Sequence, residues 1–429
     1  MENSSIIGSA SRRKFFKTGA IAAAAAGFMS KAYADGGDTI RIGWIGCGGR
    51  GGGAVVNALN ADKNVKLVAI GDTFKDKLDS SLAELHKKEK FKNLIDVPPE
   101  RQFVGFDAYK QVIDSGVDVV ILTTPPHFRP MHLAYAIEKG KHCFCEKPVA
   151  VDATGVRSVL ASCELAKQKK LSVVSGLCWR YDPGTAAFTK YLHDGGIGEI
   201  QTIQTDYCGQ GLWSRPRQEA WSDMEFQLRN WLYYTWLSGD FIVEQNVHNL
   251  DRVAWAMNAY PVSAYCLGGR QTRTDAIYGN IFDHMATVFE FANGSKVFSY
   301  CRQQPGTASS NGDWYYGTKG RAEWNWDNDK VTGEKPAQFT NHLNQGYQIE
   351  HDRLFAAIRK GEPVNNGEYM AKSTLMGIMG REAAYTGQLI KWDDLMSSPQ
   401  NLSPQNYAWG KIEFPKVPMP GFTKFEKKA

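Results

Sequence analysis

A glycine-rich turn between an apolar run and a helical stretch is the feature that most limits how this chain can fold. The apolar run covers residues 39–45, and the helical stretch continues to Leu59. Between them, the glycines of a G-x-G-x-x-G pattern allow a tight turn and let backbone N–H groups approach a pyrophosphate, which the positive end of a helix also attracts. The pattern predicts a dinucleotide-binding Rossmann unit in which the following residues contact the cofactor: Gly46, Gly48, Gly49, Arg50 and Gly51.

An acidic residue follows at the distance that such a unit requires. Residues 65–70 form a second apolar run that ends in Gly71-Asp72, about twenty positions after the last glycine. A carboxylate at this place accepts hydrogen bonds from the hydroxyl groups of the adenine ribose and repels a 2′-phosphate. Asp72 therefore predicts NAD in preference to NADP. Lys75 leaves NADP open, because its ammonium group could pair with that phosphate.

Apolar runs and helical stretches continue to alternate as far as the middle of the chain. Short apolar runs of this kind, separated by helices, are typical of buried parallel strands in an α/β fold. We therefore predict a doubly wound parallel sheet over residues 38–178. The later elements are apolar runs at 117–122, 142–145 and 171–177 and helical stretches at 129–139 and 154–169.

Polar residues that follow two of these runs are predicted to reach the cofactor. Thr123, Pro125 and His127 follow one run, and Glu146 and Lys147 follow the next. The carboxyl ends of parallel strands share one edge of the sheet, where a bound dinucleotide lies.

The rest of the chain, residues 179–429, is predicted to form a second, α+β domain. A chain of 429 residues with 43% hydrophobic residues is long enough for two hydrophobic cores. Asn293-Gly294 lies between two short apolar runs and is a strong hairpin signal. Two further helical stretches are predicted to return and cover the Rossmann side, at residues 350–358 and 372–385.

The order of several motifs resembles one known family. The glycine-rich turn, a Thr-Pro pair before a His-containing helix, and Glu146-Lys147-Pro148 at a strand end resemble the Gfo/Idh/MocA family of glucose-fructose oxidoreductases and inositol dehydrogenases, and residues 317–320 and 380–387 do so too. The resemblance implies nicotinamide-dependent chemistry on sugars, with Lys147 beside the nicotinamide. It also implies an open, mostly antiparallel sheet in the second domain, whose outer face makes contacts in a homo-oligomer, a dimer or a tetramer. Burial in such a pocket predicts that the charge of Lys147 is disfavoured.

A predicted helix over residues 239–255 carries further candidate catalytic groups. Glu244 and His248 are four residues apart and project from one face, and Asp251 follows one turn later. A carboxylate that binds one imidazole nitrogen leaves the other free to take a proton from a substrate hydroxyl. The family resemblance implies an acidic residue and a basic histidine at this spacing. Glutamate in place of the more usual aspartate leaves open whether Glu244 orients His248 or contacts the sugar. No third ligand lies at a diagnostic distance, so no metal site is predicted.

The segment before this helix, from Trp213 to Trp236, is rich in aromatic and cationic residues. Sugars present apolar C–H faces beside hydroxyl groups, so aromatic platforms with nearby donors suit a sugar site. Trp231 is the candidate substrate contact in this segment, although any single member could belong to the core or to a dimer interface. Arg180 is a second candidate, because the resemblance implies substrate-facing residues just after the last Rossmann strand.

Residues 1–34 resemble a twin-arginine export signal, with Arg12-Arg13 before an alanine-rich apolar stretch and a predicted cleavage after Ala34. This predicts export in the folded state to the periplasm, no membrane attachment after cleavage, and a tightly bound cofactor, because free NAD is not expected there. The signal holds five basic residues and one acidic residue, a net +4 of the formal +5. The mature protein is therefore close to neutral, which argues against a nucleic-acid partner.

The eight cysteines form no C-x-x-C pair, so neither a zinc site nor a dense disulfide framework is indicated. Cys143 and Cys145 are two positions apart in a predicted strand. We therefore expect them on one buried face of it.

Three functions fit these patterns. The first is reversible oxidation of a secondary hydroxyl of a sugar or glycoside, in which His248 removes the hydroxyl proton and Lys147 supports the developing carbonyl oxygen. The second is a redox-neutral glycosidase or lyase that works through a transient keto-sugar, although the intact Glu146-Lys147-Pro148 is more similar to the dehydrogenases. The third is a non-catalytic sugar-binding protein, which would leave Lys147, Glu244 and His248 without a task.

Overall fold

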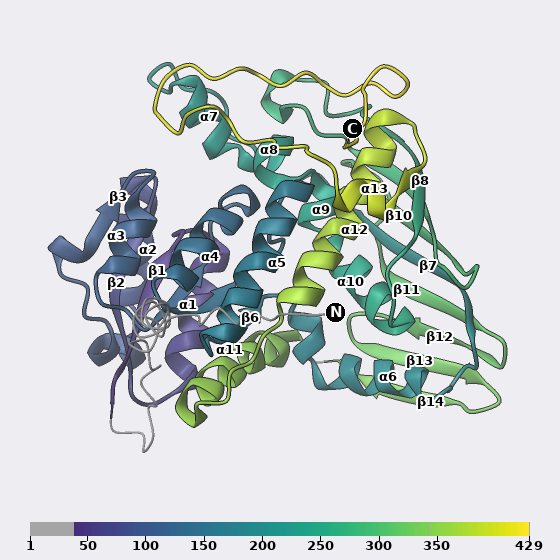
Figure 1. Ribbon diagram of the computed structural model, residues 1–429, viewed down its shortest axis with the longest axis horizontal. Helices are drawn as coiled ribbons and strands as arrows, with labels where there is room; N and C mark the ends of the chain where they lie inside the picture. The colour runs from purple at the N-terminus through teal and green to yellow at the C-terminus, as the bar shows by residue number, and fades with distance from the viewer. Residues whose placement is uncertain (1–37, 342, 429) are drawn as a thin grey trace, which may run out of the picture.

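Two separate β-sheets organise the chain in the computed structural model, which describes residues 38–341 and 343–428. The first sheet is built from the N-terminal part and the second from the C-terminal part, and helices lie between them (Figure 1). The predicted export signal lies outside the described residues. In the part of the chain that is described, no helix is both long and apolar enough to cross a membrane.

The first sheet has six parallel strands, and its order reverses between β1 and β4. This is the doubly wound Rossmann arrangement, as predicted, and the point of reversal is where such folds bind ligands. The short β3 was not predicted, because three residues give no periodic signal. From one edge to the other the strands are β3 (Gln102–Val104), β2 (Val65–Asp72), β1 (Ile40–Ile45), β4 (Val119–Leu122), β5 (His142–Cys145) and β6 (Val173–Ser175).

Helices cover both faces of this sheet because its strands are buried on both sides. In β4, Val119 and Ile121 join one hydrophobic core, and Val120 and Leu122 join the other. The neighbouring β5 also alternates, with both of its cysteines in one core and its phenylalanine in the other, as predicted. One face carries α1 (Gly49–Ala61) and α2 (Lys75–His86), and the other carries α3 (Ala108–Asp114), α4 (Arg129–Glu138) and α5 (Ala153–Gln168).

The second sheet has nine strands and is mostly antiparallel, as the resemblance implied. Only β7 and β10 run parallel among its described neighbours, and the predicted hairpin is formed by β9 and β10. In sheet order the strands are β14 (Ala337–Thr340), β13 (Asn328–Gly333), β12 (Gly320–Trp324), β11 (Ser310–Gly317), β7 (Ile200–Gly209), β10 (Lys296–Gln303), β9 (His284–Glu290), β8 (Ser263–Gly269) and β15 (Ile390–Lys391).

Helices from the second half connect the two sheets. As predicted, two of them return to the Rossmann side: α11 (Leu343–Lys360) packs against α1, and α12 (Gly367–Thr386) packs against α5. Leu354 and Phe355 of α11 are fully buried in the same core as the β1 side chains. The remaining helices are α6 (Pro183–His193), α7 (Asp223–Arg229), α8 (Thr235–Ser238), α9 (Phe241–Glu244), α10 (Val247–Met257) and α13 (Trp392–Met396).

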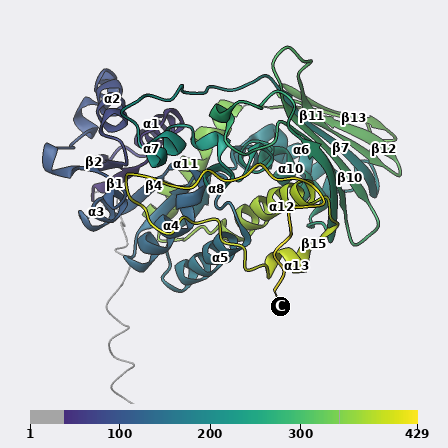
Figure 2. The same ribbon diagram turned by 90° about the horizontal axis from the view of Figure 1, so that it is seen from above.

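The last described segment, residues 397–428, contains neither helix nor strand. It leaves α13 and runs back across the molecule past α8 and α7 toward the Rossmann domain, as the yellow trace in Figures 1 and 2 shows. A backbone hydrogen bond fixes the segment beside α7: the N–H of Met224 donates to the carbonyl of Gly410 at 3.1 Å. The stretch around Gly410 therefore lies beside α7, and the chain then returns to α13, where the Lys427 ammonium pairs with Asp394 at 3.0 Å.

Candidate active site

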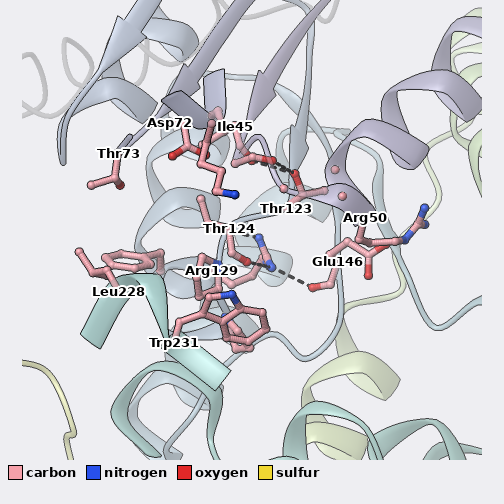
Figure 3. A pocket seen from close by; sticks show the side chains of 18 of the residues that line it. Ile45, Arg50, Asp72, Thr73, Thr123, Thr124, Arg129, Glu146, Leu228 and Trp231 are labelled. Atoms are coloured by element: carbon pink, nitrogen blue, oxygen red, sulfur yellow. Dashed lines mark hydrogen bonds and ion pairs between the residues drawn. The ribbon is translucent and has the colours of Figure 1, made fainter. Parts of the chain in front are cut away.

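A cavity of about 590 Å³ opens at the carboxyl ends of β1, β2, β4 and β5. Its lining comes from the glycine-rich turn on one side and from β7, α9 and the segment before α8 on the other. Figure 3 shows Asp72 and Thr73 at one end, Glu146 beside Arg50 at another, and Leu228 and Trp231 on the facing wall. The cavity therefore lies at the switch point of the first sheet, where the second domain covers it.

The glycine-rich turn has the shape that a dinucleotide needs. Gly46 has φ +97°, and a Cβ there would lie 2.5 Å from the backbone nitrogen of Thr124, so only glycine fits. At Gly48 and Gly49 a Cβ would meet no atom within 4 Å, which leaves bare backbone open to the cavity at the start of α1. The Thr123 hydroxyl braces the turn by donating to the Gly46 carbonyl at 2.7 Å. Backbone N–H groups at such a helix start bind phosphate.

Asp72 ends β2 and lines the cavity. Its carboxylate accepts hydrogen bonds from the backbone N–H groups of Cys47 at 2.6 Å and Phe74 at 2.8 Å, which fix it beside the glycine-rich turn. Burial raises the pKa of Asp72, and these two hydrogen bonds oppose that rise. Lys75 does not share this position: its ammonium pairs with Asp79 at 2.7 Å, and Lys77 lines the cavity instead.

Arg50 ties the start of α1 to the end of β5. Its Nε lies 2.5 Å from Oε1 of Glu146, and its NH2 donates to Glu350 of α11 at 2.9 Å. Burial lowers the pKa of Arg50, but the two carboxylates outweigh burial and raise it overall. Arg50 and Glu146 therefore form a charged part of the cavity lining. Both were predicted to contact the cofactor. Glu350 has no counterpart in the sequence-based prediction, because it lies three hundred positions from Arg50.

Arg129 is a buried cation at the centre of the cavity wall that the sequence did not single out. Its Nε donates to the Glu146 carbonyl at 2.9 Å, and its NH2 donates to the Thr124 carbonyl at 2.6 Å. No ion pair joins it to a carboxylate among the described residues, and burial lowers its pKa to about 10. The guanidinium therefore fixes the strand ends of β4 and β5 relative to each other, as Figure 3 shows.

Lys147 and Glu244 form an ion pair in the cavity wall. The Lys147 Nζ donates to Glu244 Oε1 at 2.9 Å and to the Glu244 backbone carbonyl at 2.6 Å. Burial lowers the pKa of Lys147, but the carboxylates of Glu244 and Glu146 together outweigh burial, so the pKa is raised. The expectation of a disfavoured charge was therefore wrong: Lys147 is a held cation, because two carboxylates compensate it.

The predicted helix over residues 239–255 is interrupted. It consists of α9 and α10, and the chain turns at Gln245 and Asn246 between them. Asn246 is fully buried and donates from its side chain to Ser299 of β10 at 3.0 Å, which holds the turn against the second sheet. Although both residues are described, no hydrogen bond joins Glu244 and His248. Glu244 binds Lys147 instead of orienting the imidazole.

His248 lines the same cavity. Its Nδ1 is buried and has no hydrogen-bond partner among the described residues. Burial, reinforced by the positive charges of Lys147 and Arg252, holds the pKa of His248 well below its ordinary value. The ring is therefore neutral at physiological pH, with a nitrogen able to accept a proton.

Two predicted contacts lie away from the cavity. His127 is buried, and its Nε2 shares a hydrogen bond of 2.8 Å with the hydroxyl of Tyr407; it packs on Trp236, and only the residues on either side of it line the cavity. The guanidinium of Arg180 forms a two-point pair with Asp251, at 2.8 and 2.9 Å, on the side of α10 that faces α12. Each side chain is thus held by a residue far away in the sequence, Tyr407 in one case and Asp251 in the other.

The remaining predicted residues meet in the cavity together with groups that were missed. Trp231 lines it, as do Thr123 and Pro125. Tyr207 of β7 was missed; its hydroxyl donates to the side chain of Gln245 at 2.9 Å, next to Lys147 and Glu244. Strand residues of this kind carry no local signal. In the described part of the chain no group of three His, Cys, Asp or Glu side chains could hold a metal ion.

The C-terminal segment, residues 397–428, packs behind the part of the cavity wall near Asp72. The ring of Trp409 lies 4.9 Å from that of Phe106 and 5.5 Å from that of Phe74, measured between ring centroids. Both phenylalanines line the cavity. Gln227 of α7 donates to the backbone carbonyl of Glu413 at 3.1 Å, so the segment is tied to the second domain as well. No local pattern around Trp409 indicates this role.

Two family models match the chain in sequence. Residues 40–175 match the oxidoreductase family with an NAD-binding Rossmann fold, and residues 185–323 match the GFO/IDH/MocA C-terminal domain. Together they cover most of the described chain. The first matched range contains all six strands of the first sheet, and the second contains β7 to β11 of the second sheet.

Curated relatives are distant and differ in what they do. An inositol 2-dehydrogenase from Rhizobium meliloti is 23% identical over 60% of this chain and 67% of its own length. A 2,7-anhydro-N-acetylneuraminate hydratase from Escherichia coli is 25% identical over 46% of this chain, which spans only about half of that relative, 48%. A glycosyl hydrolase family 109 protein from Shewanella pealeana is 28% identical over 41% of this chain and 37% of its own length.

Solved structures share the fold over most of the chain. An aldose-aldose oxidoreductase from Caulobacter crescentus, complexed with glycerol, has a TM-score of 0.65 at 19% identity and covers 82% of this chain and 99% of its own. A levoglucosan dehydrogenase in complex with NADH and levoglucosan has a TM-score of 0.64 at 16% identity, with the same two coverages. At these identities the likeness concerns the fold.

Proposed function

The chain belongs to the GFO/IDH/MocA family of oxidoreductases, and its N-terminal domain binds NAD(P); from this premise we propose that it transfers hydride between a secondary hydroxyl of a sugar or glycoside and the bound nicotinamide. The observation that carries the proposal is the position of Lys147, Glu244 and His248 on one wall of the cavity into which the glycine-rich turn opens. A bound nicotinamide dinucleotide supplies the hydride acceptor.

The proton steps follow from the charge states of the two groups. His248 is neutral, so its free nitrogen accepts the proton of the substrate hydroxyl as the C–H bond is broken. Lys147 is cationic and stabilises the negative charge that develops on the substrate oxygen. Glu244 acts through Lys147: it holds the ammonium group in place with two contacts, from its side chain and its backbone carbonyl.

The direct test is a substrate panel on the purified protein. We expect inositols, aldoses and glycosides to differ widely in rate, and the active ones to raise cofactor absorbance at 340 nm while a keto product appears by mass spectrometry. The Lys147→Ala protein is the matched control for background reduction. A panel that yields no oxidised product and no cleaved product would leave a sugar-binding role and contradict the proposal.

A redox-neutral glycosidase or lyase activity is the second candidate. It is favoured by the relatives named as a hydratase and as a glycosyl hydrolase family 109 protein. In this case the sugar would be oxidised and reduced again within one turnover. Released aglycone with no net change in cofactor absorbance would favour this candidate over the first.

We also propose that the cofactor is retained and that the protein works in the periplasm after twin-arginine export. Phe74 and Phe106 line the cavity and are backed by Trp409, and this packing supports slow release. The measurement is to purify the protein from the periplasm without added cofactor, denature it and quantify the released NAD(H). A mature protein that emerges empty would contradict retention, and one found only in the cytoplasm would contradict export.

We also propose that the protein forms a homo-oligomer, a dimer or a tetramer. Leu267 of β8 and Tyr300 of β10 both pair with Ala286 of β9, so they stand in one row on one face of the second sheet, and both side chains are exposed. Large exposed apolar side chains in such a row suit an interface between two copies. Light scattering should give a dimer or tetramer, and Leu267→Asp should shift it toward the monomer.

A further inference from the structure

The loop of residues 210–217 presents two exposed side chains to the cavity. Trp213 is 44% exposed, and Arg215 is also exposed, yet both line the cavity that holds Lys147 and His248. Trp231 lies beside them, with its ring centroid 6.3 Å from that of Trp213 and the two ring planes at 58°. Large exposed aromatic side chains next to a cavity are typical of ligand contacts.

Two buried polar side chains fix the backbone of this loop. The hydroxyl of Tyr233 lies 3.0 Å from the carbonyl of Leu212 and 2.8 Å from that of Trp213, to which it donates. Asn230 accepts from the Arg215 N–H at 2.8 Å and donates to the Arg215 carbonyl at 3.0 Å. Tyr233 and Asn230 are both fully buried. The backbone that carries the two exposed side chains is therefore fixed before any ligand arrives, which reduces the entropy cost of binding.

In the described part of the chain no carboxylate pairs with Arg215, unlike three other cations that line the cavity. Arg50, Lys147 and Arg229 also line the cavity, and each forms an ion pair with a carboxylate. Lys77 and the buried Arg129 also form no ion pair among the described residues, but the Arg129 guanidinium donates to two backbone carbonyls. No ion pair involves Arg215 in residues 38–341 and 343–428, and its guanidinium carbon lies 5.4 Å from the centre of the Trp213 ring. The carboxylate of Glu244, which also lines the cavity, is held by Lys147. At this loop the cavity therefore offers a planar cation without a paired carboxylate beside an aromatic surface.

We propose that Trp213 and Arg215 form an outer subsite that takes a second sugar ring bearing a carboxylate, so that the substrate is an acidic glycoside. The proposal rests on the proposed function, because it extends the same site. An indole packs against the C–H face of a sugar ring, and a guanidinium binds a carboxylate at two points. Lys147 and His248 then act on the inner ring, and the outer ring sets which glycoside is chosen.

The test compares two disaccharides that differ in one group. Cellobiose and cellobiouronic acid are titrated calorimetrically into the purified, cofactor-loaded protein. We expect the acid to bind about tenfold more tightly at low salt, since a charge-assisted, two-point hydrogen bond is worth this much, and the difference to shrink at high salt. In Arg215→Gln the preference for the acid should disappear while the affinity for cellobiose stays unchanged.

Arg217→Gln is the matched control. Arg217 belongs to the same loop and is exposed, but it pairs with Asp223 and does not line the cavity. Its variant should keep the preference for the acid. Trp213→Ala should weaken both disaccharides, because it removes the platform.

Equal binding of the two disaccharides by the unchanged protein, binding of neither, or a loss of preference in Arg217→Gln as large as in Arg215→Gln would overturn the subsite. Loss of bound NAD(H) in Arg215→Gln with the acid preference intact would assign Arg215 to the dinucleotide and overturn it too. Because the titration detects binding whether or not the sugar is oxidised, an Arg215-dependent preference in a protein that oxidises no glycoside would reject the proposed function and keep the subsite.

Discussion

The two ends of the cavity are built in different ways. The cofactor end consists largely of backbone from one continuous stretch, β1 to β2, in which glycines and a single carboxylate, Asp72, carry the chemistry. The substrate end consists of side chains from segments far apart in sequence: Lys147 follows β5, Tyr207 lies in β7, and His248 lies in α10. A backbone site depends on local conformation, whereas a side-chain site depends on how the second domain packs. Variants that separate these two dependences test the comparison.

The largest effect is expected at Lys147. Lys147→Ala removes the held cation, and we expect kcat to fall by about a thousandfold, because electrostatic stabilisation of the developing oxygen charge is lost. The cofactor end should be untouched, so the NAD(H) content after purification should match that of the unchanged protein. An equal loss of bound cofactor would show that the two ends are not independent.

A somewhat smaller loss is expected at His248. His248→Ala should lower kcat by about a hundredfold or more, as for a removed general base. Because the pKa of His248 lies well below its ordinary value, the unchanged protein should keep a flat kcat/KM through neutral pH and lose activity only as the pH falls through that lowered pKa. A pH profile that declines already near pH 6.5 would reject His248 as the base.

At the cofactor end, Gly46→Ala should strain the backbone of the glycine-rich turn. The added Cβ would lie 2.5 Å from the nitrogen of Thr124, at a φ of +97°, so we expect destabilisation of about 1–3 kcal/mol and loss of bound NAD(H). Gly49→Ala is the control for strain, since its Cβ meets no atom within 4 Å. Thermal unfolding without cofactor should distinguish the two. Equal melting temperatures would contradict the role of the turn.

Asp72→Ala should have a more moderate effect. It removes a carboxylate that faces the cavity, so NAD should bind about tenfold more weakly and discrimination against NADP should relax. Lys75→Ala should change neither, because Lys75 pairs with Asp79 outside the cavity. Unchanged cofactor preference in Asp72→Ala would remove this residue from cofactor recognition.

The smallest effect is expected at the C-terminal segment. Trp409→Ala removes a ring that supports Phe74 and Phe106 without touching Lys147 or His248. We expect release of NAD(H) to become a few times faster, since one aromatic pair is worth about 1 kcal/mol, with kcat unchanged at saturating cofactor. Dilution of the loaded protein into buffer, followed by cofactor fluorescence, measures the rate. An unchanged release rate would assign the segment to stability alone.

The difference between a backbone site and a side-chain site also explains which parts of the molecule could be predicted from the sequence. The strands and helices around the glycine-rich turn lie where the sequence pattern indicated. Each is a short element that ends at glycine or another turn-forming residue nearby in the sequence. Lys147 could be singled out only through its motif. No local pattern indicates that Glu244 binds Lys147 rather than His248, because this depends on the turn at Asn246, whose side chain donates to Ser299 of the second sheet.

The errors share one cause, which is a partner from a distant segment. Arg180 was expected to face the substrate, but Asp251 binds it. His127 follows a strand end, where cofactor contacts are found, but Tyr407 of the C-terminal segment holds it inside the protein. Spacing along the chain identifies which residues share a face. It does not identify which other segment covers that face, and so the substrate end required the structure.

The return of α11 and α12 to the first sheet has a consequence for the order in which the protein is made. Leu354 and Phe355 complete the core around β1, yet they leave the ribosome long after the strands that they cover. At about 5–20 residues per second, the interval between residues 178 and 360 is roughly 10 to 40 seconds. During that time the face of the parallel sheet that carries α1 and α2 lacks α11. The domain whose synthesis begins first is therefore among the last to be finished, and residues 38–178 alone do not make a complete folding unit.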